Sequence, residues 1–183
     1  MVRAVFLDRD GTLNEDLGGY FHEPDKLELL PGVAEGLKRM KSMGYLLIVV
    51  SNQSGVAKGL FTEDDTKAVN KKINKVLEKH DVRINKFYYC PHGENDGCGC
   101  RKPKTGMLIR ASKEMGIDLN GSWLVGDKSD DAKAAENVKK LFPGFRFIGV
   151  ETGHGMKDGR FKAGPAAMAK DLVEAAGIIG QRK

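Results

Sequence analysis

The stretch that decides the fold is Ala4–Thr12, AVFLDRDGT, close to the start of the chain. Its first four residues form a continuous apolar run, which is typical of a strand buried on both faces of a parallel sheet. Asp8 and Asp10 follow directly, and a carboxylate at Asp8 can attack phosphorus without a separate base. Asp10 can then protonate the leaving oxygen and later take a proton from water. Taken alone, the pattern also fits an ordinary strand followed by an Asp-Gly turn.

Strands and helices are expected to alternate along the rest of the chain. Further apolar runs predict strands at Tyr45–Val50, Phe87–Tyr89, Trp123–Val125 and Phe145–Val150. Apolar residues at helical spacing and capping signals predict helices at Gly32–Met43, from Thr62 through Leu77, and at Gly106–Met115, Asp130–Leu141 and Pro165–Ala176. This alternation predicts one α/β domain over residues 1–183, a Rossmann-like three-layer α/β/α fold with a mostly parallel sheet.

Composition narrows the classes of partner. The chain has 183 residues, 40% of them hydrophobic, which is enough for a full core without disulfides. The net charge of +5 is spread over lysines on helical segments, and only 7% of residues are aromatic. We therefore expect no nucleic-acid partner and no membrane partner, and a surface that favours a small anionic substrate. No secretory signal or membrane span is visible, so we expect a cytoplasmic monomer.

Three polar clusters follow predicted strands. Asp8 and Asp10 end the first strand, Ser51–Gln53 ends the second, and Gly126–Lys128 ends the fourth. In open α/β sheets, ligands bind beyond the carboxyl ends of the strands. Each cluster alone could be ordinary loop chemistry, but together the three predict one common site.

Phosphate chemistry assigns roles within this predicted site. A carboxylate can approach a phosphate dianion only when local negative charge is cancelled, and Asp8 and Asp127 are suitable oxygen ligands for a Mg²⁺ that does this. Asp131 has two open interpretations. It can orient the metal site from behind, or it can be a solvent-facing residue at a helix start, where the helix dipole favours a carboxylate.

Hydroxyl and cationic groups complete the expected phosphate contacts. The Ser51 hydroxyl and the backbone amides beyond it can hydrogen-bond the transferring oxygens. Arg101 and Lys102 supply positive charge, and arginine can bind a phosphate through two parallel hydrogen bonds. Lys128 can contribute a similar charge.

The order of these motifs resembles that of the haloacid dehalogenase superfamily of phosphatases. The residues that carry the resemblance are Asp8–Thr12 (DRDGT), Ser51–Gly55 (SNQSG), Cys100–Pro103 (CRKP), Gly106–Met107 and Val125–Lys128 (VGDK). It covers nearly the whole length, from the first strand to about Val150. The resemblance implies a Mg²⁺-dependent sugar bisphosphate phosphatase that works through an aspartyl-phosphate.

Residue by residue, the resemblance implies Asp8 as nucleophile, Asp10 as acid/base, and Asp8, Asp10 and Asp127 as the magnesium ligands. Contacts with a small phosphorylated sugar are expected from Asp16, Gly19, Tyr20, Ser51, Asn52, Gln53, Ser54, Arg101, Lys102 and Lys128. Lys104 is the alternative to Lys102 for the role of catalytic lysine, but the family pattern of a lysine directly before a proline selects Lys102. Two departures are small: serine at position 51, where threonine is also common, and a loop before Tyr20 that is one residue longer than expected.

All three cysteines lie in one segment with a histidine: Cys90, His92, Cys98 and Cys100. An odd number of cysteines argues against a disulfide framework, and three thiols with one imidazole fit a closed tetrahedral site for structural Zn²⁺. Buried free cysteines with a chance histidine are the alternative. Because Cys100 directly precedes Arg101, we expect the zinc to hold the neighbouring cations at the phosphate site.

No large cap domain is expected, because the segments after Asp10 and Ser51 are too short. Two loop histidines, His22 and His154, receive no assigned role. Histidinol-phosphate phosphatase stays open as an alternative enzyme, because it shares the acidic motif and the zinc loop. Outside the enzymes, a zinc-dependent module that binds nucleic acid or phosphoprotein is the alternative, although such a module has no use for Asp8 and Asp10. A catalytically inactive relative is also conceivable.

Overall fold

The computed structural model describes residues 2–16, 20–157 and 167–181. Six parallel strands form one sheet in the order β3-β2-β1-β4-β5-β6. They are β1 (Ala4–Leu7), β2 (Leu46–Asn52), β3 (Lys86–Cys90), β4 (Trp123–Gly126), β5 (Arg146–Val150) and β6 (Ala167–Ala169). The fully buried central strands explain the continuous apolar runs in the sequence.

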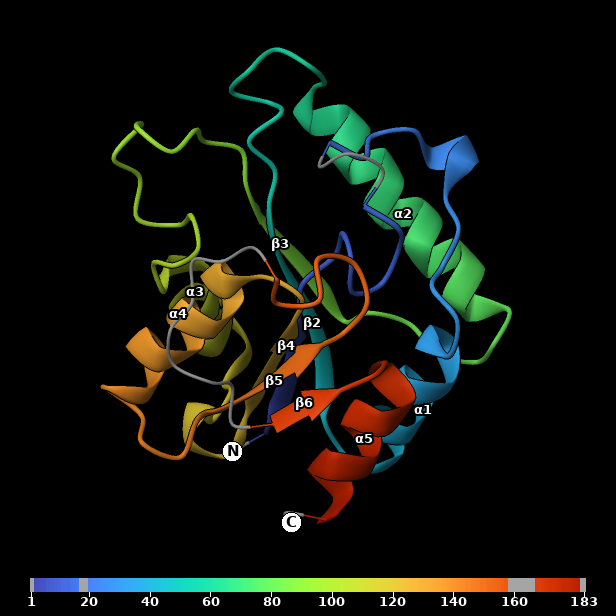
Figure 1. Ribbon diagram of the computed structural model, residues 1–183, viewed down its shortest axis with the longest axis vertical. Helices are drawn as coiled ribbons and strands as arrows, with labels where there is room; N and C mark the ends of the chain where they lie inside the picture. The colour runs from blue at the N-terminus through green and yellow to red at the C-terminus, as the bar shows by residue number, and fades with distance from the viewer. Residues whose placement is uncertain (1, 17–19, 158–166, 182–183) are drawn as a thin grey trace.

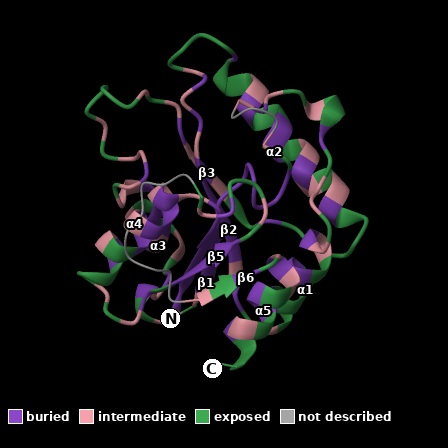
Figure 2. Ribbon diagram, in the orientation of Figure 1, coloured by how far each residue is buried: buried purple, intermediate pink, exposed green. Residues whose placement is uncertain are grey.

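Helices cover both faces of this sheet, which makes the three-layer fold expected from the sequence (Figure 1). They are α1 (Val33–Ser42), α2 (Glu63–Glu78), α3 (Gly106–Met115), α4 (Ser129–Lys139) and α5 (Leu172–Gln181), with short 3₁₀ turns at Pro24–Lys26 and Leu119–Gly121. One core lies under α1, α2 and α5, and the other lies under α3 and α4. Buried residues therefore concentrate in the sheet and on the inner helix faces (Figure 2).

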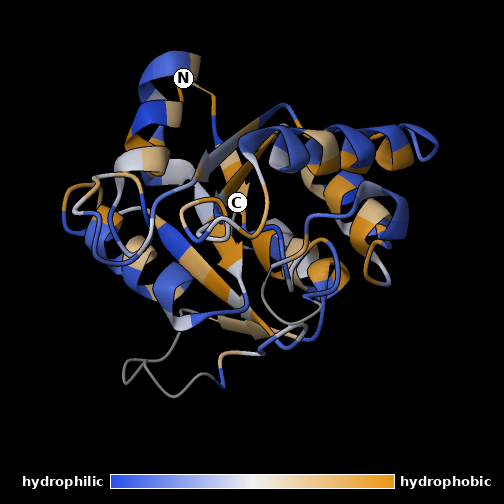
Figure 3. Ribbon diagram, turned by 90° about the horizontal axis from the view of Figure 1, so that it is seen from above, coloured by the Kyte–Doolittle hydropathy of each residue, from blue (hydrophilic) through white to orange (hydrophobic). Residues whose placement is uncertain are grey.

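Local sequence explains where the longest helix begins. Thr62 accepts a hydrogen bond from the Asp65 N–H at 3.2 Å, and the Asp65 carboxylate accepts one from the Thr62 N–H at 2.8 Å. This reciprocal capping box satisfies two donors that a helix start leaves free. The helix then buries Val69, Ile73 and Leu77 on one face. The same pattern of apolar inner faces and polar outer faces is visible from above (Figure 3).

The predicted helix at Pro165–Ala176 is wrong in part, and its first two residues lie outside the described residues. Ala167–Ala169 forms the edge strand β6, paired in parallel with β5, and α5 starts only at Leu172. Asp171 explains the later start, because its carboxylate accepts hydrogen bonds from the N–H groups of Val173 at 2.8 Å and Glu174 at 2.9 Å. Alanine-rich sequence favours a helix, but pairing with a neighbouring strand overrides that preference.

Strand order brings the three polar clusters together. The strands that carry them, β1, β2 and β4, are adjacent in the middle of the sheet. Because all three run parallel, their carboxyl ends meet at one edge. In the described chain, a loop with one 3₁₀ turn connects β1 to α1 and a loop alone connects β2 to α2, so neither connection holds a large cap domain. None of the described helices is long and apolar enough to cross a membrane.

Candidate active site

Three buried carboxylates lie together where β1 and β4 end. Oxygen atoms of Asp8, Asp127 and Asp131 all lie within 4.8 Å of one another. Asp8 follows β1, Asp127 follows β4, and Asp131 lies in the first turn of α4. Asp131 is only 1% exposed, so the solvent-facing interpretation is wrong. It instead stabilises the helix start by accepting a hydrogen bond from the Lys128 N–H at 3.2 Å.

Lys102 inserts a positive charge into this acidic cluster. Its ammonium lies 2.7 Å from Asp8 Oδ1 and 2.6 Å from Asp131 Oδ1, and it donates to the Val50 carbonyl at 2.7 Å. Burial by itself would lower the pKa of Lys102, but Asp131 and Asp8 hold that pKa above its ordinary value. Lys102 is therefore a permanent cation beside the expected nucleophile. Lys104 instead contacts the Cys98 carbonyl.

The acidic cluster has the properties of a divalent-cation site. Burial, followed by repulsion from Asp8 and Asp131, raises the pKa of Asp127 to about 8. Burial also raises the pKa of Asp131 to about 6, against the opposing effect of Lys102. Asp127 Oδ1 is buried and has no hydrogen-bond partner among the described residues. Clustered, poorly compensated carboxylate oxygens of this kind fit a hard cation such as Mg²⁺.

The loop after β5 belongs to this site, although its role was not predicted from the sequence. The His154 N–H donates to Asp127 Oδ2 at 2.7 Å, and the Met156 N–H donates to the Asp127 carbonyl at 2.6 Å. Gly153 has a φ of +57°, and a Cβ there would lie 2.4 Å from Asp127 Oδ2 and 2.5 Å from Gly11 Cα. Only glycine allows this close approach. The Gly-His-Gly sequence after a strand was the available signal.

Asp10 lies outside the acidic cluster. Its carboxylate accepts hydrogen bonds from the Arg9 guanidinium, at 2.9 Å to each oxygen, from Asn14 Nδ2 at 3.0 Å and from Gln53 Nε2 at 2.8 Å. The structure therefore does not bring the Asp10 side chain into the expected magnesium set, and it places Asp131 beside Asp8 and Asp127 instead. Arg9 and Asn14 were also missed in the sequence, because their contacts depend on loop geometry.

The cluster after β2 divides into two functions. Ser51 is buried, and its hydroxyl accepts a hydrogen bond from Gln53 Nε2 at 2.8 Å. Asn52 instead holds the backbone of Lys102, with hydrogen bonds of 2.9 Å from the Lys102 N–H and 3.0 Å to the Lys102 carbonyl. In this structure Asn52 therefore positions the lysine, and Gln53 connects Ser51 to Asp10.

Asp16 links two loops at the mouth of the site. Its Oδ2 lies 2.8 Å from Lys128 Nζ and 3.0 Å from His154 Nε2. Burial by itself would lower the pKa of Lys128, but nearby carboxylates, with Asp8 first, hold it above its ordinary value. The structure thus brings the predicted substrate contacts Asp16 and Lys128 together as an ion pair.

The remaining predicted contacts lie in the loops after β1 and β2. Tyr20 contacts the Lys58 ammonium through its hydroxyl, which brings the loop after β1 against the loop after β2. Ser54 lies in that second loop, half-buried. His22 bonds the Tyr20 carbonyl through Nδ1 at 2.7 Å, the structural role that a loop histidine commonly has. Gly19 lies outside the described residues.

Arg101 lies at the boundary between the site and the cysteine loop. Its guanidinium is 3.5 Å from the Glu94 carboxylate, and its Nη1 is buried without a hydrogen-bond partner in the described part of the chain. Arg101 and Lys102 both line a hollow of about 220 Å³, together with the cysteine loop and Asp130. Glu94 and Lys104 line it as well, and the Lys102 ammonium is paired with Asp8 and Asp131.

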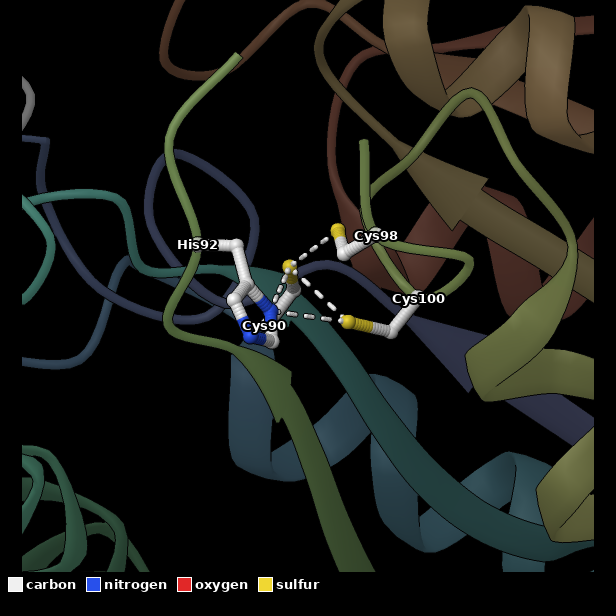
Figure 4. Close-up of side chains that lie close together, drawn as sticks. All are labelled: Cys90, His92, Cys98 and Cys100. Atoms are coloured by element: carbon white, nitrogen blue, oxygen red, sulfur yellow. Dashed lines mark hydrogen bonds between the residues drawn. The ribbon is translucent and has the colours of Figure 1, made fainter. Parts of the chain in front are cut away.

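The cysteine loop brings four metal-binding atoms together (Figure 4). Cys90 Sγ lies 3.6 Å from His92 Nδ1, 3.6 Å from Cys98 Sγ and 3.1 Å from Cys100 Sγ. The three thiols are free. Zn–S bonds of about 2.3 Å in a tetrahedron place sulfur atoms ~3.8 Å apart. The Cys90–Cys98 distance is close to this value, and the Cys90–Cys100 distance is shorter.

The thiols differ in their pKa values. Burial raises the pKa of Cys90. Burial also acts to raise the pKa of Cys98, but hydrogen bonds from the Arg101 N–H and from the neighbouring thiols outweigh it and lower the pKa to about 7. A cation bound here would favour the thiolate form of all three, because the thiolate is the ligand.

Comparison with known sequences finds relatives that are named as phosphatases. The profile of a family described as polynucleotide kinase 3 phosphatase matches residues 4–143. A D-glycero-beta-D-manno-heptose-1,7-bisphosphate 7-phosphatase from Haemophilus influenzae is 47% identical over 145 residues, which cover 76% of this chain and 78% of the relative. The enzyme of the same name from Escherichia coli K12 is 43% identical over 141 residues, 73% of each chain.

Solved structures agree with the sequence relatives. A D,D-heptose 1,7-bisphosphate phosphatase from B. bronchiseptica, crystallised with magnesium and phosphate, superimposes with a TM-score of 0.88 at 31% identity, and the match covers 100% of both chains. A protein of the same name from Burkholderia thailandensis gives a TM-score of 0.67 at 27% identity, over 96% of this chain and 97% of that chain.

Proposed function

Because the chain belongs to the polynucleotide kinase 3 phosphatase family and is a phosphatase of the haloacid dehalogenase type, we propose that it removes the 7-phosphate of D-glycero-D-manno-heptose 1,7-bisphosphate. The observation that supports this proposal most directly is the pairing of a buried Lys102 ammonium with Asp8 inside a cluster of three carboxylates. That arrangement supplies a nucleophile, a fixed cation and a cation site at one sheet edge.

The proposed reaction has two steps. Lys102 holds Asp8 Oδ1, which leaves the other oxygen to attack phosphorus. A bond forms between that oxygen and phosphorus while the bond to the sugar oxygen breaks, and Asp10 gives this oxygen its proton. A water molecule then attacks the same phosphorus and gives a proton back to Asp10. Inorganic phosphate leaves and Asp8 is regenerated.

Asp8 and Asp127 are the residues we propose for holding Mg²⁺, with Asp131 adding negative charge behind them. Bound Mg²⁺ would neutralise the phosphate and lower repulsion between it and the nucleophile. Once a bound cation favours the ionised form of all three carboxylates, they and the Lys102 ammonium carry a net charge of −2, opposite to that of Mg²⁺. Ser51, Lys102 and Lys128 supply the remaining phosphate contacts in this proposal.

Without added Mg²⁺, the protein is expected to become less stable as pH rises from about 5 to 8. The pKa of Asp127 in the folded protein, about 8, lies above its ordinary value of 3.8. A folded-state pKa above the unfolded value gives stability that is present at low pH and is lost as pH rises through the folded-state pKa. Mg²⁺ should reverse this loss, so the Mg²⁺-induced rise in Tm should be larger at pH 8 than at pH 6.

Thermal unfolding at both pH values, with zinc retained, measures this effect. Asp127→Asn is the matched variant, because it removes the titrating group with little change in shape. It should flatten both the pH dependence and the response to Mg²⁺. An equal Mg²⁺-induced shift at both pH values in the parent protein would contradict a cation site at Asp127.

For the cysteine loop we propose a structural Zn²⁺ held by Cys90, His92, Cys98 and Cys100. The support is the close approach of the four ligand atoms and the position of Cys100, directly before Arg101. A fixed Cys100 sulfur would restrict the backbone that carries the next two residues, the cations Arg101 and Lys102. The proposed zinc therefore acts on catalysis only through the placement of those cations.

Removal of one zinc ligand should reduce activity while the sheet remains folded. For Cys98→Ser we expect loss of bound zinc and a fall in phosphate release of ~10–100-fold, the range found when groups that support a metal site are removed. Zinc content by elemental analysis, circular dichroism and phosphate release measure the three parts. Ser112→Ala is the control, because it changes a side chain by a single heavy atom outside the cysteine loop. Full activity in a zinc-free Cys98→Ser protein would refute the proposed role.

A short substrate panel tests the proposed function. It contains both anomers of D-glycero-D-manno-heptose 1,7-bisphosphate, histidinol phosphate and fructose 1,6-bisphosphate, each with and without Mg²⁺. Phosphorus NMR identifies which phosphate of a bisphosphate is removed. Preference for the 7-phosphate of a heptose bisphosphate supports the proposal, whereas preference for histidinol phosphate would keep the mechanism and change the substrate. If no ester releases phosphate, the proposal that the protein is a phosphatase is contradicted.

A further inference from the structure

The Asp10 carboxylate has every acceptor position occupied. Oδ1 accepts from Arg9 Nε at 2.9 Å and Asn14 Nδ2 at 3.0 Å, and Oδ2 accepts from Arg9 Nη2 at 2.9 Å and Gln53 Nε2 at 2.8 Å. A carboxylate offers about four lone-pair positions. To exchange a proton with substrate or water, Asp10 must therefore release one of these four hydrogen bonds.

The amides of Asn14 and Gln53 each have two N–H groups and two acceptors, so release of either bond to Asp10 would leave a donor unpaired. A count of donors at Arg9 distinguishes its own two bonds to Asp10. Arg9 Nη2 carries two N–H groups but has three acceptors: Asp10 Oδ2, the Phe21 carbonyl at 2.8 Å and Gln53 Oε1 at 3.0 Å. If Nη2 releases Oδ2 while Gln53 Nε2 still donates to that oxygen, both Nη2 N–H groups keep an acceptor. Arg9 Nε has a single N–H, whose partner is Asp10 Oδ1. Releasing Oδ1 would leave that buried donor unpaired, which is unfavourable.

We infer that Arg9 is a positioning residue for Asp10: its Nε holds Oδ1 as a pivot, while its Nη2 releases Oδ2 to carry the proton. This inference rests on the proposed phosphatase function and adds a residue and a specific oxygen to it. Arg9 touches neither the acidic cluster nor Lys102 in the described structure, and it acts through Asp10.

Arg9 is well suited to serve as a fixed point. Its side chain is fully buried, with 0% exposure. Three separate elements bind it, through Phe21 in the loop after β1, Gln53 after β2 and Asn70 on α2, whose Oδ1 lies 3.5 Å from Nη1. Gln53 Nε2 also donates to the Ser51 hydroxyl at 2.8 Å. The position of Asp10 is thereby tied to the proposed phosphate site.

Leaving-group dependence tests the inference, because it separates proton donation from every other contribution. An alkyl phosphate needs a proton on its leaving oxygen, whereas p-nitrophenolate leaves readily as an anion. The ratio kcat/KM reports only steps through formation of the aspartyl-phosphate. Asp10→Asn defines the full loss of proton donation, ~10²–10⁴-fold for the alkyl ester.

Arg9→Met is expected to lower kcat/KM for the alkyl phosphate ~10–100-fold, which is part of the loss expected when the general acid is removed altogether. For p-nitrophenyl phosphate the expected loss is less than ~3-fold. Arg9→Lys keeps the charge but cannot make both bonds to the carboxylate, so it should not restore the alkyl activity. In Arg9→Met/Asp10→Asn, the losses should not add, because both act on one proton transfer. Arg39→Met, on the exposed face of α1, is the matched arginine control.

Equal losses for the two esters, restored activity in Arg9→Lys, or additive losses in the double variant would each overturn the inference. If Arg9→Met does not fold, Arg9→Lys decides the matter, because it keeps the buried positive charge while it cannot make both bonds to the carboxylate. Its alkyl activity should fall selectively. An unchanged ratio between the two esters in Arg9→Lys would overturn the inference. Failure of the proposed function is distinct, since the parent protein would then release no phosphate from either ester.

Discussion

Asp8→Asn is expected to lower the rate of phosphate release by ~10⁴-fold or more, without destabilising the protein in the absence of Mg²⁺. An amide cannot attack phosphorus, but its oxygen can still accept the hydrogen bond from Lys102. The Asp8 charge also acts to raise the pKa of both Asp127 and Asp131. Its removal relieves repulsion among buried carboxylates, so the Tm should stay the same or rise. Mg²⁺-dependent phosphate release and thermal unfolding measure the two effects.

Asp25→Asn makes the same charge change on an exposed turn and should leave both activity and Tm unchanged. The combination of lost activity with retained stability is the distinguishing result for Asp8. More than about a hundredth of the original activity in Asp8→Asn, with Asp25→Asn unchanged, would mean that another residue is the nucleophile.

Lys102→Met is the change for which we expect large losses of both activity and stability. It removes the cation that lies between Asp8 and Asp131, so two buried carboxylates lose their partner. Removal of one member of a buried ion pair destabilises by about 3–5 kcal/mol. Loss of one preorganised donor at a reacting oxygen lowers kcat by ~10²–10³-fold. Chemical denaturation and phosphate release measure these effects.

A second substitution separates the two effects of Lys102. Lys102→Met/Asp131→Asn removes one of the unpaired charges, so it should regain part of the stability while activity remains low. Lys113→Met, on the exposed surface of α3, is the matched lysine control. Wild-type stability in the Lys102→Met single variant would show that the buried ion pairs do not hold this sheet edge together.

The sequence alone predicted the sheet and most of the acidic site, for identifiable physical reasons. Buried parallel strands give continuous apolar runs, so the strands at Ala4–Leu7 and Trp123–Val125 were readily found. Catalytic side chains in α/β folds follow the carboxyl ends of strands, which made Asp8 and Asp127 visible from local sequence. The cysteine loop was equally visible, because its potential ligands lie close together in the chain.

The missed parts depend on contacts that are distant in sequence. Asp131 had two open interpretations until Lys102 was found beside it, 29 positions earlier in the chain. The loop at Gly153 approaches Asp127 only because β4 and β5 are neighbours. The strand β6 was mistaken for the start of a helix because alanine carries no strand signal. In each case, tertiary pairing decided what local propensity could not.

The central claim is that a phosphoryl group passes through Asp8. The most direct test is to mix the enzyme with a rapidly cleaved substrate and Mg²⁺, quench with acid during turnover, and map the digested protein by mass spectrometry. We expect the mass of one phosphoryl group on the N-terminal peptide that contains Asp8, and its absence in Asp8→Asn. A phosphoryl group at any other residue would contradict the account. So would its absence from the Asp8 peptide when phosphate is released and the kinetics require an intermediate.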